Sequence, residues 1–265
     1  MKKIVLIAIM IFILSVYPLF NIMGISQNGD KPAKVDLSEG NEIIKSLSDY
    51  DVKTAQKNVN IAEKEREHKF GNYHRVDDVL ADIDSGKTTY RKVFQDVYIV
   101  GDSLMNGLEA YNILNSNHLV TQVSASLYHL DGNLNKIIRM NPPVLILHYG
   151  VNMISTDRKY LNNYIAMYTS LIQKLQASLP DTRIIISGIF PVNRNIARAN
   201  RFGMINEYNQ NLINMCNNLG IEYMDSSSVL YAHPECYGGD GIHLSKAFYE
   251  KYWLRFIIRE MGITG

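Results

Sequence analysis

The sequence contains few cysteines and no excess of charge of either sign. Only 2 of its 265 residues are cysteine, too few for a disulfide scaffold or for a zinc site built on cysteine ligands. Its 27 basic and 26 acidic residues leave a net charge of +1, so it has no basic excess to neutralise the phosphates of a nucleic acid. With 17 glycines and 7 prolines, collagen-like and low-complexity classes are also excluded.

The N-terminus carries the one long hydrophobic run. After Lys2 and Lys3, residues 4–24 carry no charge, and about 21 residues can cross the ~30 Å hydrocarbon core as a helix. No Ala-x-Ala-like cleavage site or lipid-accepting cysteine follows, so we expect a transmembrane signal-anchor over residues 1–24, with a cleaved signal peptide as the alternative. The two lysines favour the cytoplasmic side. The protein is therefore expected in the cell membrane as a single-pass protein with its main domain outside, or alternatively as a secreted protein.

A polar, weakly helical segment separates this run from the rest of the chain. Residues 25–36 are polar and typical of a linker. Over 37–67, apolar residues recur at three- or four-residue steps among many charges, which indicates a stalk or a helix laid over the domain. Val76–Ile83 is a short amphipathic helix that ends at Asp84, Ser85 and Gly86. The sequence predicts a linker and helical stalk over residues 25–95 and the main domain over residues 96–265.

Within the main domain, short hydrophobic runs alternate with segments of helical period. The runs are Val97–Val100, Leu119–Val123, Val144–Leu147, Arg183–Ile189 and Ile221–Met224. The clearest helical segments are Leu161–Leu179, Phe202–Leu219 and Ser245–Met261. Strands that alternate with helices form a parallel sheet covered on both faces, so the predicted class is α/β, a three-layer α/β/α sandwich with a five-stranded parallel sheet. The ligand site of such a sheet lies beyond the carboxyl ends of its strands.

Ser103 stands at the carboxyl end of the first predicted strand and precedes a helical segment. A serine at a strand-to-helix turn is exposed at the edge of the sheet, and its N–H at the start of the helix is free to face an anion. These properties suit a nucleophile. A serine that only caps the helix is the alternative.

Two other loops carry polar residues that suit the same chemistry. After the third strand, the Asn152 amide can donate a hydrogen bond to an oxyanion, and Gly150 allows a tight turn beside it; an asparagine tolerated in a turn is the alternative. Ahead of the last helix, Asp240 stands three residues before His243 in a glycine-rich turn. Such an aspartate can orient an imidazole that takes a proton from a serine, although a metal-binding fragment or a simple turn would also fit.

The three motifs together resemble the SGNH hydrolases, also called the GDSL esterase/lipase family. They read Gly-Asp-Ser-Leu at 101–104, Gly-Val-Asn at 150–152 and Asp-Gly-Ile-His at 240–243. The resemblance covers about Val97 to Met261 and implies a flavodoxin-like sandwich. It also implies that Ser103 is the nucleophile, His243 the general base and acid, and Asp240 the residue that orients His243. The oxyanion hole would consist of the Ser103 N–H and the Asn152 side chain, with Gly150 in the same loop.

The sequence departs from the family pattern at two positions. The family has a glycine after the second strand, whose N–H is a third oxyanion donor, whereas this chain has Ala125 and Ser126 there. Either N–H could serve, because a backbone donor needs no glycine. The acidic residue that ends the family's Gly-x-Asn-Asp motif is replaced by Met153, so the bracing of this loop must differ.

The expected activity is that of an extracytoplasmic serine esterase without a metal or cofactor. Its expected partner is an acylated carbohydrate of the cell wall or cell surface, most simply an O-acetyl ester, or another ester substrate. The alternatives are an O-acetyltransferase, which could work with a membrane acyl-transfer partner protein, a lipase or lysophospholipase, and a non-catalytic module of a surface-polysaccharide system. The polar, basic segment from Pro191 to Arg201 suits a sugar, carboxylate or phosphate-bearing polymer, or is a solvated loop.

Several other residues have ordinary structural interpretations. Cys216 and Cys236 could close a disulfide loop of ~21 residues in an exported protein, or remain free thiols. The tyrosines at 160, 164 and 168 follow helical spacing and are interpreted as helix packing rather than as a sugar-binding platform. Four other histidines lack the paired spacing of metal ligands and are expected at the surface or in hydrogen bonds, although the third of them is close to the candidate site in sequence: His118, His129, His148 and His233.

Overall fold

The computed structural model describes residues 76–197 and 201–262. All of them belong to the second of two compact units of the chain, Glu65–Gly265. The predicted membrane span, the linker and the first part of the predicted stalk lie outside the described residues. Of the helices that the structure describes, none has the length and apolar character needed to cross a membrane.

Five parallel strands form a single sheet in the order β2-β1-β3-β4-β5. Their bounds are β1 Val97–Gly101, β2 Leu119–Thr121, β3 Val144–His148, β4 Arg183–Ser187 and β5 Glu222–Met224. Gly101 pairs with Thr121 on one side and with His148 on the other, so the carboxyl ends of the three neighbouring strands are level. This arrangement confirms the predicted five-stranded parallel sheet, and each strand starts within a residue of its prediction.

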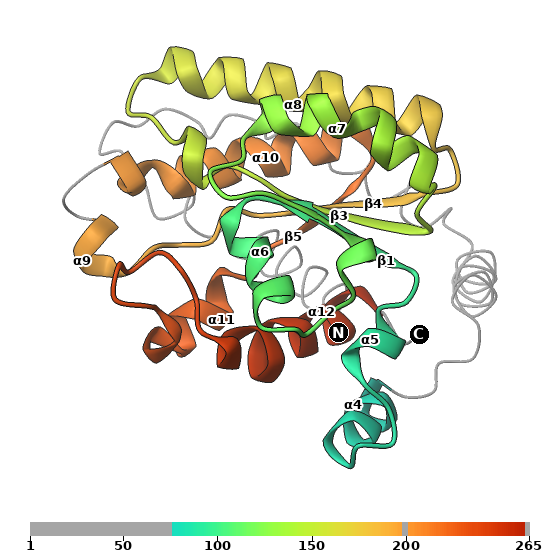
Figure 1. The fold of residues 1–265 in the computed structure, drawn as a ribbon. Coiled ribbons are helices and arrows are strands. Elements are labelled where there is room, and N and C mark those ends of the chain that lie inside the picture. The colour runs from blue at the N-terminus through green and yellow to red at the C-terminus, as the bar shows by residue number, and fades with distance from the viewer. Residues whose placement is uncertain (1–75, 198–200, 263–265) are drawn as a thin grey trace, which may run out of the picture. The chain divides into compact units, whose positions relative to one another are not determined.

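Helices cover both faces of the sheet (Figure 1). One face is covered by the helices that connect β2 to β3, β3 to β4 and β4 to β5. These are α7 (Leu127–Met140), α8 (Arg158–Ser178) and α10 (Ile205–Leu219). The opposite face is covered by α6 (Ser103–Ala110), α11 (Ser227–Ala232) and α12 (Leu254–Met261). Because crossovers between parallel strands are right-handed, the reversal of direction after β2 moves the connecting helices to the other face. The strand order thus creates a switch point between β1 and β3, where open α/β sheets bind their ligands.

The other elements of the described residues are short. They are α4 (Val76–Asp84), α5 (Tyr90–Val93), α9 (Arg194–Ala197), a π-helix η5 (Phe248–Trp253) directly before α12, and the 3-10 turns η1 (Ser116–His118), η2 (Val151–Met153), η3 (Arg201–Met204) and η4 (Pro234–Cys236). The π-helix therefore occupies the first part of the predicted helix 245–261. Its Trp253 is fully buried and donates from the indole N–H to Ser226 Oγ at 3.1 Å.

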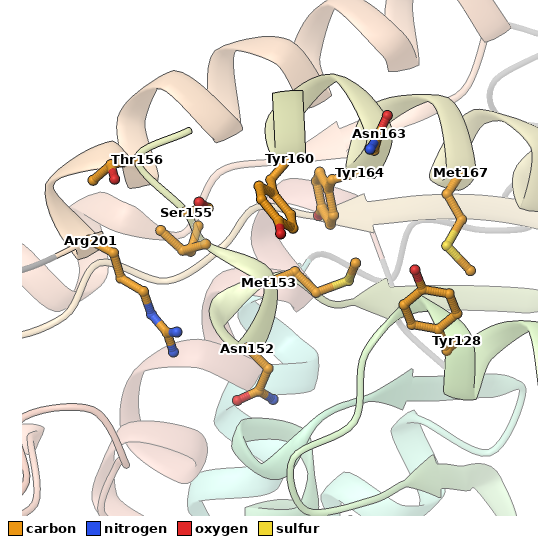
Figure 2. Close-up of a pocket in the computed structure, with 11 residues that line it drawn as sticks. Tyr128, Asn152, Met153, Ser155, Thr156, Tyr160, Asn163, Tyr164, Met167 and Arg201 are labelled. Atoms are coloured by element: carbon orange, nitrogen blue, oxygen red, sulfur yellow. The ribbon is translucent and has the colours of Figure 1, made fainter. Parts of the chain in front are cut away.

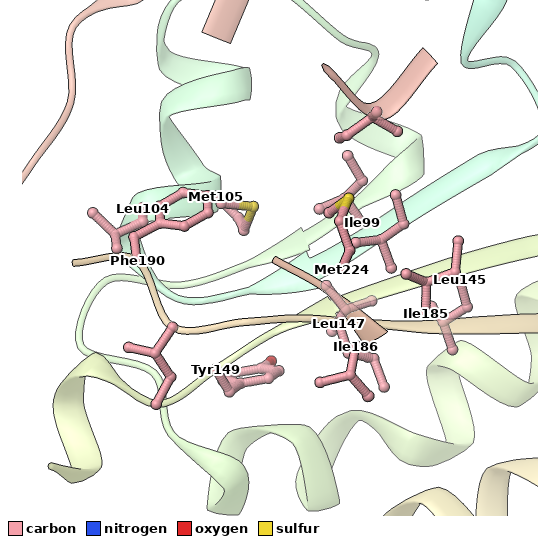
Figure 3. Packing of buried hydrophobic residues seen from close by; sticks show 14 of the residues in the cluster. Ile99, Leu104, Met105, Leu145, Leu147, Tyr149, Ile185, Ile186, Phe190 and Met224 are labelled. Carbon is pink, nitrogen blue, oxygen red and sulfur yellow. The ribbon is translucent and has the colours of Figure 1, made fainter. Parts of the chain in front are cut away.

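The hydrophobic core lies on both sides of the three central strands. Ile99, Leu147 and Ile186 have no exposed surface, as expected for a parallel sheet that is covered on both faces. Figure 3 shows Met105 on one side of the strands and Tyr149 on the other. The core therefore holds the ends of β1 and β3 in a fixed position, and the loops that follow these strands start from a rigid base.

Residues 76–95 pack on this core. Phe94 of the α5 C-terminus is 1% exposed and Leu80 of α4 is 3% exposed, and both belong to the main hydrophobic cluster. Arg255 of α12 also pairs with both carboxylate oxygens of Asp84, at 2.7 and 3.0 Å. The last part of the segment predicted as linker and stalk is therefore an integral part of the main domain.

The two cysteines are both buried and both free. Cys216 lies on α10 and Cys236 in η4. Burial raises the pKa of the Cys216 thiol to about 12, so this thiol is an inert part of the core. Of the two alternatives left open by the sequence, the structure has the free thiols and not the disulfide.

We expect Phe94→Ala to destabilise the protein by ~3–5 kcal/mol, the usual cost of removing a buried phenylalanine side chain. Urea unfolding of the full-length chain measures this change. The matched control is Tyr231→Ala, because the Tyr231 ring is 52% exposed and its loss should change the free energy of unfolding by no more than about 0.5 kcal/mol. Equal stability of the two variants would contradict the packing of residues 76–95 on the domain.

Candidate active site

The candidate site lies at the carboxyl end of the sheet, where three loops meet. Ser103 begins α6 directly after β1, and Asn152 lies in η2 after β3. The third loop, between η4 and η5, carries Asp240 and His243. Since β1 and β3 are neighbours at the switch point of the sheet, the first two loops start side by side.

Ser103 is the first residue of α6, and Asp102 is the residue that caps this helix. Asp102 Oδ1 accepts the Leu104 N–H at 3.0 Å, and the Asp102 N–H donates to the His148 carbonyl of β3 at 3.3 Å. The Ser103 hydroxyl is therefore not used as the cap. Gly101 is needed here because a Cβ at this position would lie 2.6 Å from the His148 oxygen.

His243 connects Ser103 to Asp240. Its Nε2 lies 3.0 Å from Ser103 Oγ, and its Nδ1 lies 2.6 Å from Asp240 Oδ2. Asp240 Oδ1 accepts the backbone N–H groups of Ile242 and His243, each at 2.9 Å. The hydrogen bond from the His243 side chain, with help from these N–H groups, lowers the pKa of Asp240 to about 2. Asp240 therefore remains an anion that holds the His243 ring in one orientation.

The loop that presents His243 is a short hairpin held at both ends. Tyr237 and Leu244 form an antiparallel bridge, and the Gly238 N–H donates to the His243 carbonyl at 2.7 Å. At its tip, the Gly241 carbonyl accepts the Asn193 N–H at 2.8 Å. Gly241 has φ +68°, and a Cβ there would lie 2.8 Å from Ile196 Cγ1. A glycine is thus required at the tip, both for the backbone conformation and for the close approach of residues 193–196.

The Asn152 amide lies beside the loop that follows β2. Its Nδ2 donates to the Ala125 carbonyl at 2.9 Å, which leaves the second amide hydrogen for another acceptor. Gly150 makes this placement possible. It has φ +150°, and a Cβ at this position would lie 2.3 Å from Ile189 Cδ1.

The third oxyanion donor expected at Ala125 or Ser126 is not free in this structure. The Ala125 N–H donates to the Gln122 carbonyl at 3.2 Å, and the Ser126 N–H donates to His129 Nδ1 at 3.0 Å. The role expected for Ala125 is therefore corrected, because its carbonyl, not its N–H, serves the site by holding Asn152. The available donors are the Ser103 N–H, at the start of α6 where a helix has no internal acceptor, and the Asn152 amide.

Two tyrosines that the motifs do not include brace the loop after β3. Tyr164 of α8 donates to the Tyr149 carbonyl at 2.8 Å. The Tyr208 hydroxyl of α10 donates to the Met153 carbonyl at 3.2 Å and accepts the Ser155 N–H at 3.1 Å. These contacts support the loop in which Met153 replaces the family's acidic residue. From the sequence, Tyr164 is predicted only as a helix-packing residue, and Tyr208 is not singled out.

Two buried titratable groups lie at the strand ends, and only one of them borders the site. His148 is fully buried; its Nδ1 lies 3.1 Å from Ser187 Oγ and burial lowers its pKa to about 3, so it is a neutral core residue. Asp102, next to the candidate nucleophile, is also fully buried. Its Oδ2 has no hydrogen-bond partner among the described residues, and burial raises its pKa to about 7.

Within the described residues, no group of three or more histidine, cysteine or acidic side chains is placed to hold a metal ion. What the loops assemble instead is a serine hydroxyl next to an imidazole, whose other nitrogen is bonded to a carboxylate. This is the constellation that activates a serine for attack on an acyl carbon. The fold and the site therefore define the class of this protein as a serine-dependent enzyme that transfers acyl groups.

Comparison with known proteins identifies the family. Residues 99–251 match the model of the GDSL-like lipase/acylhydrolase family, so the chain belongs to this family and is a serine esterase. No curated protein matches the chain. The predicted resemblance to the SGNH hydrolases is thereby confirmed at the level of the family.

Solved structures show the same fold at low sequence identity. A protein described as a GDSL-like lipase from Parabacteroides merdae ATCC 43184 has a TM-score of 0.50 and 14% identity, and the match covers 63% of this chain and 95% of that one. An acetylxylan esterase from Geobacillus stearothermophilus has a TM-score of 0.50 and 14% identity, with 63% and 93% covered. A catalytic mutant of that esterase has a TM-score of 0.51 and 15% identity, with 63% and 94% covered.

We expect Asp102→Asn to remove a pH dependence from the stability of the protein. Burial raises the pKa of Asp102 from its ordinary 3.8 to about 7, so the folded chain binds this proton more tightly than the unfolded chain. The stability contributed by that proton is complete below pH ~4 and is lost as the pH rises through ~7. A shift of this size corresponds to as much as ~4 kcal/mol.

Urea unfolding of both proteins between pH 4 and 8 measures this effect. Asparagine keeps an acceptor for the Leu104 N–H that Asp102 caps, so the helix cap is preserved. The difference in unfolding free energy, wild type minus variant, should decrease as the pH rises. A constant difference would show that Asp102 titrates at the same pH in the folded and unfolded chains.

Proposed function

We propose that the protein is an extracytoplasmic serine esterase that removes O-acyl groups, chiefly O-acetyl groups, from carbohydrates of the cell wall or cell surface. Ser103 is the nucleophile, His243 the general base and acid, and Asp240 the residue that orients His243. The observation that carries this proposal is the position of the His243 ring, within hydrogen-bonding distance of both Ser103 Oγ and Asp240 Oδ2. Ser103 and His243 are 140 residues apart in the sequence, yet their side chains meet at this point.

The mechanism has two halves. His243 takes the proton of the Ser103 hydroxyl as its oxygen attacks the ester carbonyl carbon, and the resulting oxyanion faces the Ser103 N–H and the Asn152 amide. His243 then gives the proton to the departing sugar oxygen, which leaves an acetyl-serine. Water enters, loses a proton to His243 and releases acetate, and Ser103 regains its proton. Asp240, held as an anion, stabilises the imidazolium that forms in both halves.

Three observations support a carbohydrate ester as the substrate. The side chains of His243 and Asp240 are 54% and 47% exposed, so the site is open enough for an acyl group on a polymer. The hydrophobic run at 4–24 favours export, which would bring the site to cell-wall and surface polysaccharides. One protein of the same fold is described as an acetylxylan esterase. An O-acetyltransferase would use the same triad, with a sugar hydroxyl in place of water.

We expect Ser103→Ala to lower the rate of p-nitrophenyl acetate hydrolysis by ~10³-fold or more, because the acyl-enzyme forms on the Ser103 hydroxyl. The variant should also lose labelling by a fluorophosphonate probe. Ser227→Ala is the matched control, since Ser227 is likewise the first residue of a helix, α11, and should retain full activity. An inert wild-type protein, or an active Ser103→Ala variant, would refute the proposed function. Acetate released from acetylated xylan, compared with acetyl transferred to an added oligosaccharide, separates the esterase from the transferase.

We expect Asn152→Ala to lower kcat by ~10²–10³-fold with little change in KM, because the amide donates mainly to the charge that develops in the transition state. Steady-state kinetics on p-nitrophenyl acetate separate the two constants. Asn211→Ala serves as the control, since this asparagine amide bonds to the Glu207 carbonyl within α10. A decrease in kcat of less than threefold for Asn152→Ala would contradict this role and leave the Ser103 N–H to stabilise the oxyanion without the amide.

A further inference from the structure

A hollow of about 570 Å³ opens beside Asn152. It lies between the loop after β3, the first half of α8 and the start of α7 (Figure 2). Its volume is that of a typical small-ligand pocket. Because Asn152 both lines this hollow and belongs to the candidate oxyanion hole, a molecule bound in the hollow would be next to the ester that Ser103 attacks.

Two exposed tyrosines form the walls of the hollow. Tyr128 at the start of α7 is 72% exposed, and Tyr160 in the first turn of α8 is 61% exposed. Tyr164 and Tyr168 are buried, as their predicted role in helix packing requires, but Tyr160 is not. The packing interpretation is therefore wrong for Tyr160. Exposed aromatic rings on either side of a pocket offer flat apolar faces, and these match the C–H face of a sugar ring.

A single arginine supplies the charge of the hollow. Arg201 is exposed, and no other charged side chain is among the described residues that line the hollow. In Figure 2, Arg201 lies on one side of Asn152 and Tyr128 lies on the other. A guanidinium presents a planar fork of N–H donors, which fits the two oxygens of a carboxylate or of a phosphate. The hydroxyl groups of Ser155 and Thr156 also line this end of the hollow.

We propose that this hollow binds a sugar unit that carries an anionic group, carboxylate or phosphate, next to the acylated unit of the substrate. Arg201 binds the anionic group, and the rings of Tyr128 and Tyr160 pack on the sugar. This inference rests on the proposed function, because it assigns the hollow to the same substrate. It narrows the substrate class from acetylated carbohydrates in general to acidic glycans.

Binding measured by calorimetry on the full-length protein in detergent tests the charge preference. Tri-galacturonate is compared with xylotriose for the carboxylate, and glucose 6-phosphate with glucose for the phosphate. We expect the acidic member of at least one pair to bind about tenfold more tightly than the neutral member, the usual effect of one charge-assisted hydrogen-bonded pair. Which pair shows the difference identifies the anionic group.

Arg201→Gln should abolish this preference, and Arg201→Lys should restore only part of it, because lysine keeps the charge but lacks the fork. The matched control is Arg139→Gln, since Arg139 is an exposed arginine in the last turn of α7, away from the loops of the site. Thermal unfolding of each variant establishes that it is folded. Tyr160→Ala should weaken the binding of acidic and neutral saccharides equally, because the Tyr160 ring packs on the sugar and not on its charged group.

The inference is overturned if neither pair shows a preference for the acidic member, if no saccharide binds the wild type, or if Arg201→Gln keeps the preference. The hydrolysis of p-nitrophenyl acetate by the wild type is measured in the same preparation. This small ester has no sugar, so its hydrolysis does not depend on the hollow. If the wild type hydrolyses this ester but binds the acidic and neutral saccharides equally, the acidic-glycan subsite alone is refuted. Absence of esterase activity would instead refute the proposed function.

Discussion

The structure of the site depends on one contact between distant parts of the chain, the hydrogen bond between Ser103 Oγ and His243 Nε2 at 3.0 Å, across 140 residues of sequence. Ser103 is placed by β1, whose end is fixed by pairing with β2 and β3. His243 is placed by a hairpin that is bonded to residues following β4. The sheet therefore acts as the common base, and the contact forms only when the parallel register and the last loop are both correct.

The burial of Asp102 is an energetically unfavourable feature of the loop that carries Ser103. A buried carboxyl group with one oxygen that has no hydrogen-bond partner is unfavourable. Asp102, directly before Ser103, is in this position within the part of the chain that the structure describes. Its other oxygen caps α6, and this releases the Ser103 hydroxyl from the capping role that serine often has. Some stability is thus given up so that the serine at the start of the helix can face His243.

Most of the fold could be predicted from the sequence, and so could the meeting of Ser103, Asp240 and His243, because both depend on local signals. Hydrophobic runs and helical period are sufficient for the strands and helices, and Ser103 and His243 lie in short motifs at the ends of elements. The paired N–H of Ala125 could not be predicted, since it depends on a turn in which Ser124 adopts φ +57°. Tyr208 was missed as a brace because its partners are more than 50 residues away in the sequence.

The exposure of Tyr160 could not be predicted from the helical spacing of the tyrosines. Helix α8 has 21 residues, which corresponds to ~32 Å, whereas a strand of 5 residues such as β3 spans ~17 Å. The helix is therefore longer than the strand before it, and Tyr160 in its first turn is 61% exposed. The same face of one helix is buried at Tyr164 and exposed at Tyr160, and both residues line the hollow. The first turn of α8 thus contributes one wall of the hollow beside Asn152, where the proposed sugar unit of the substrate would bind.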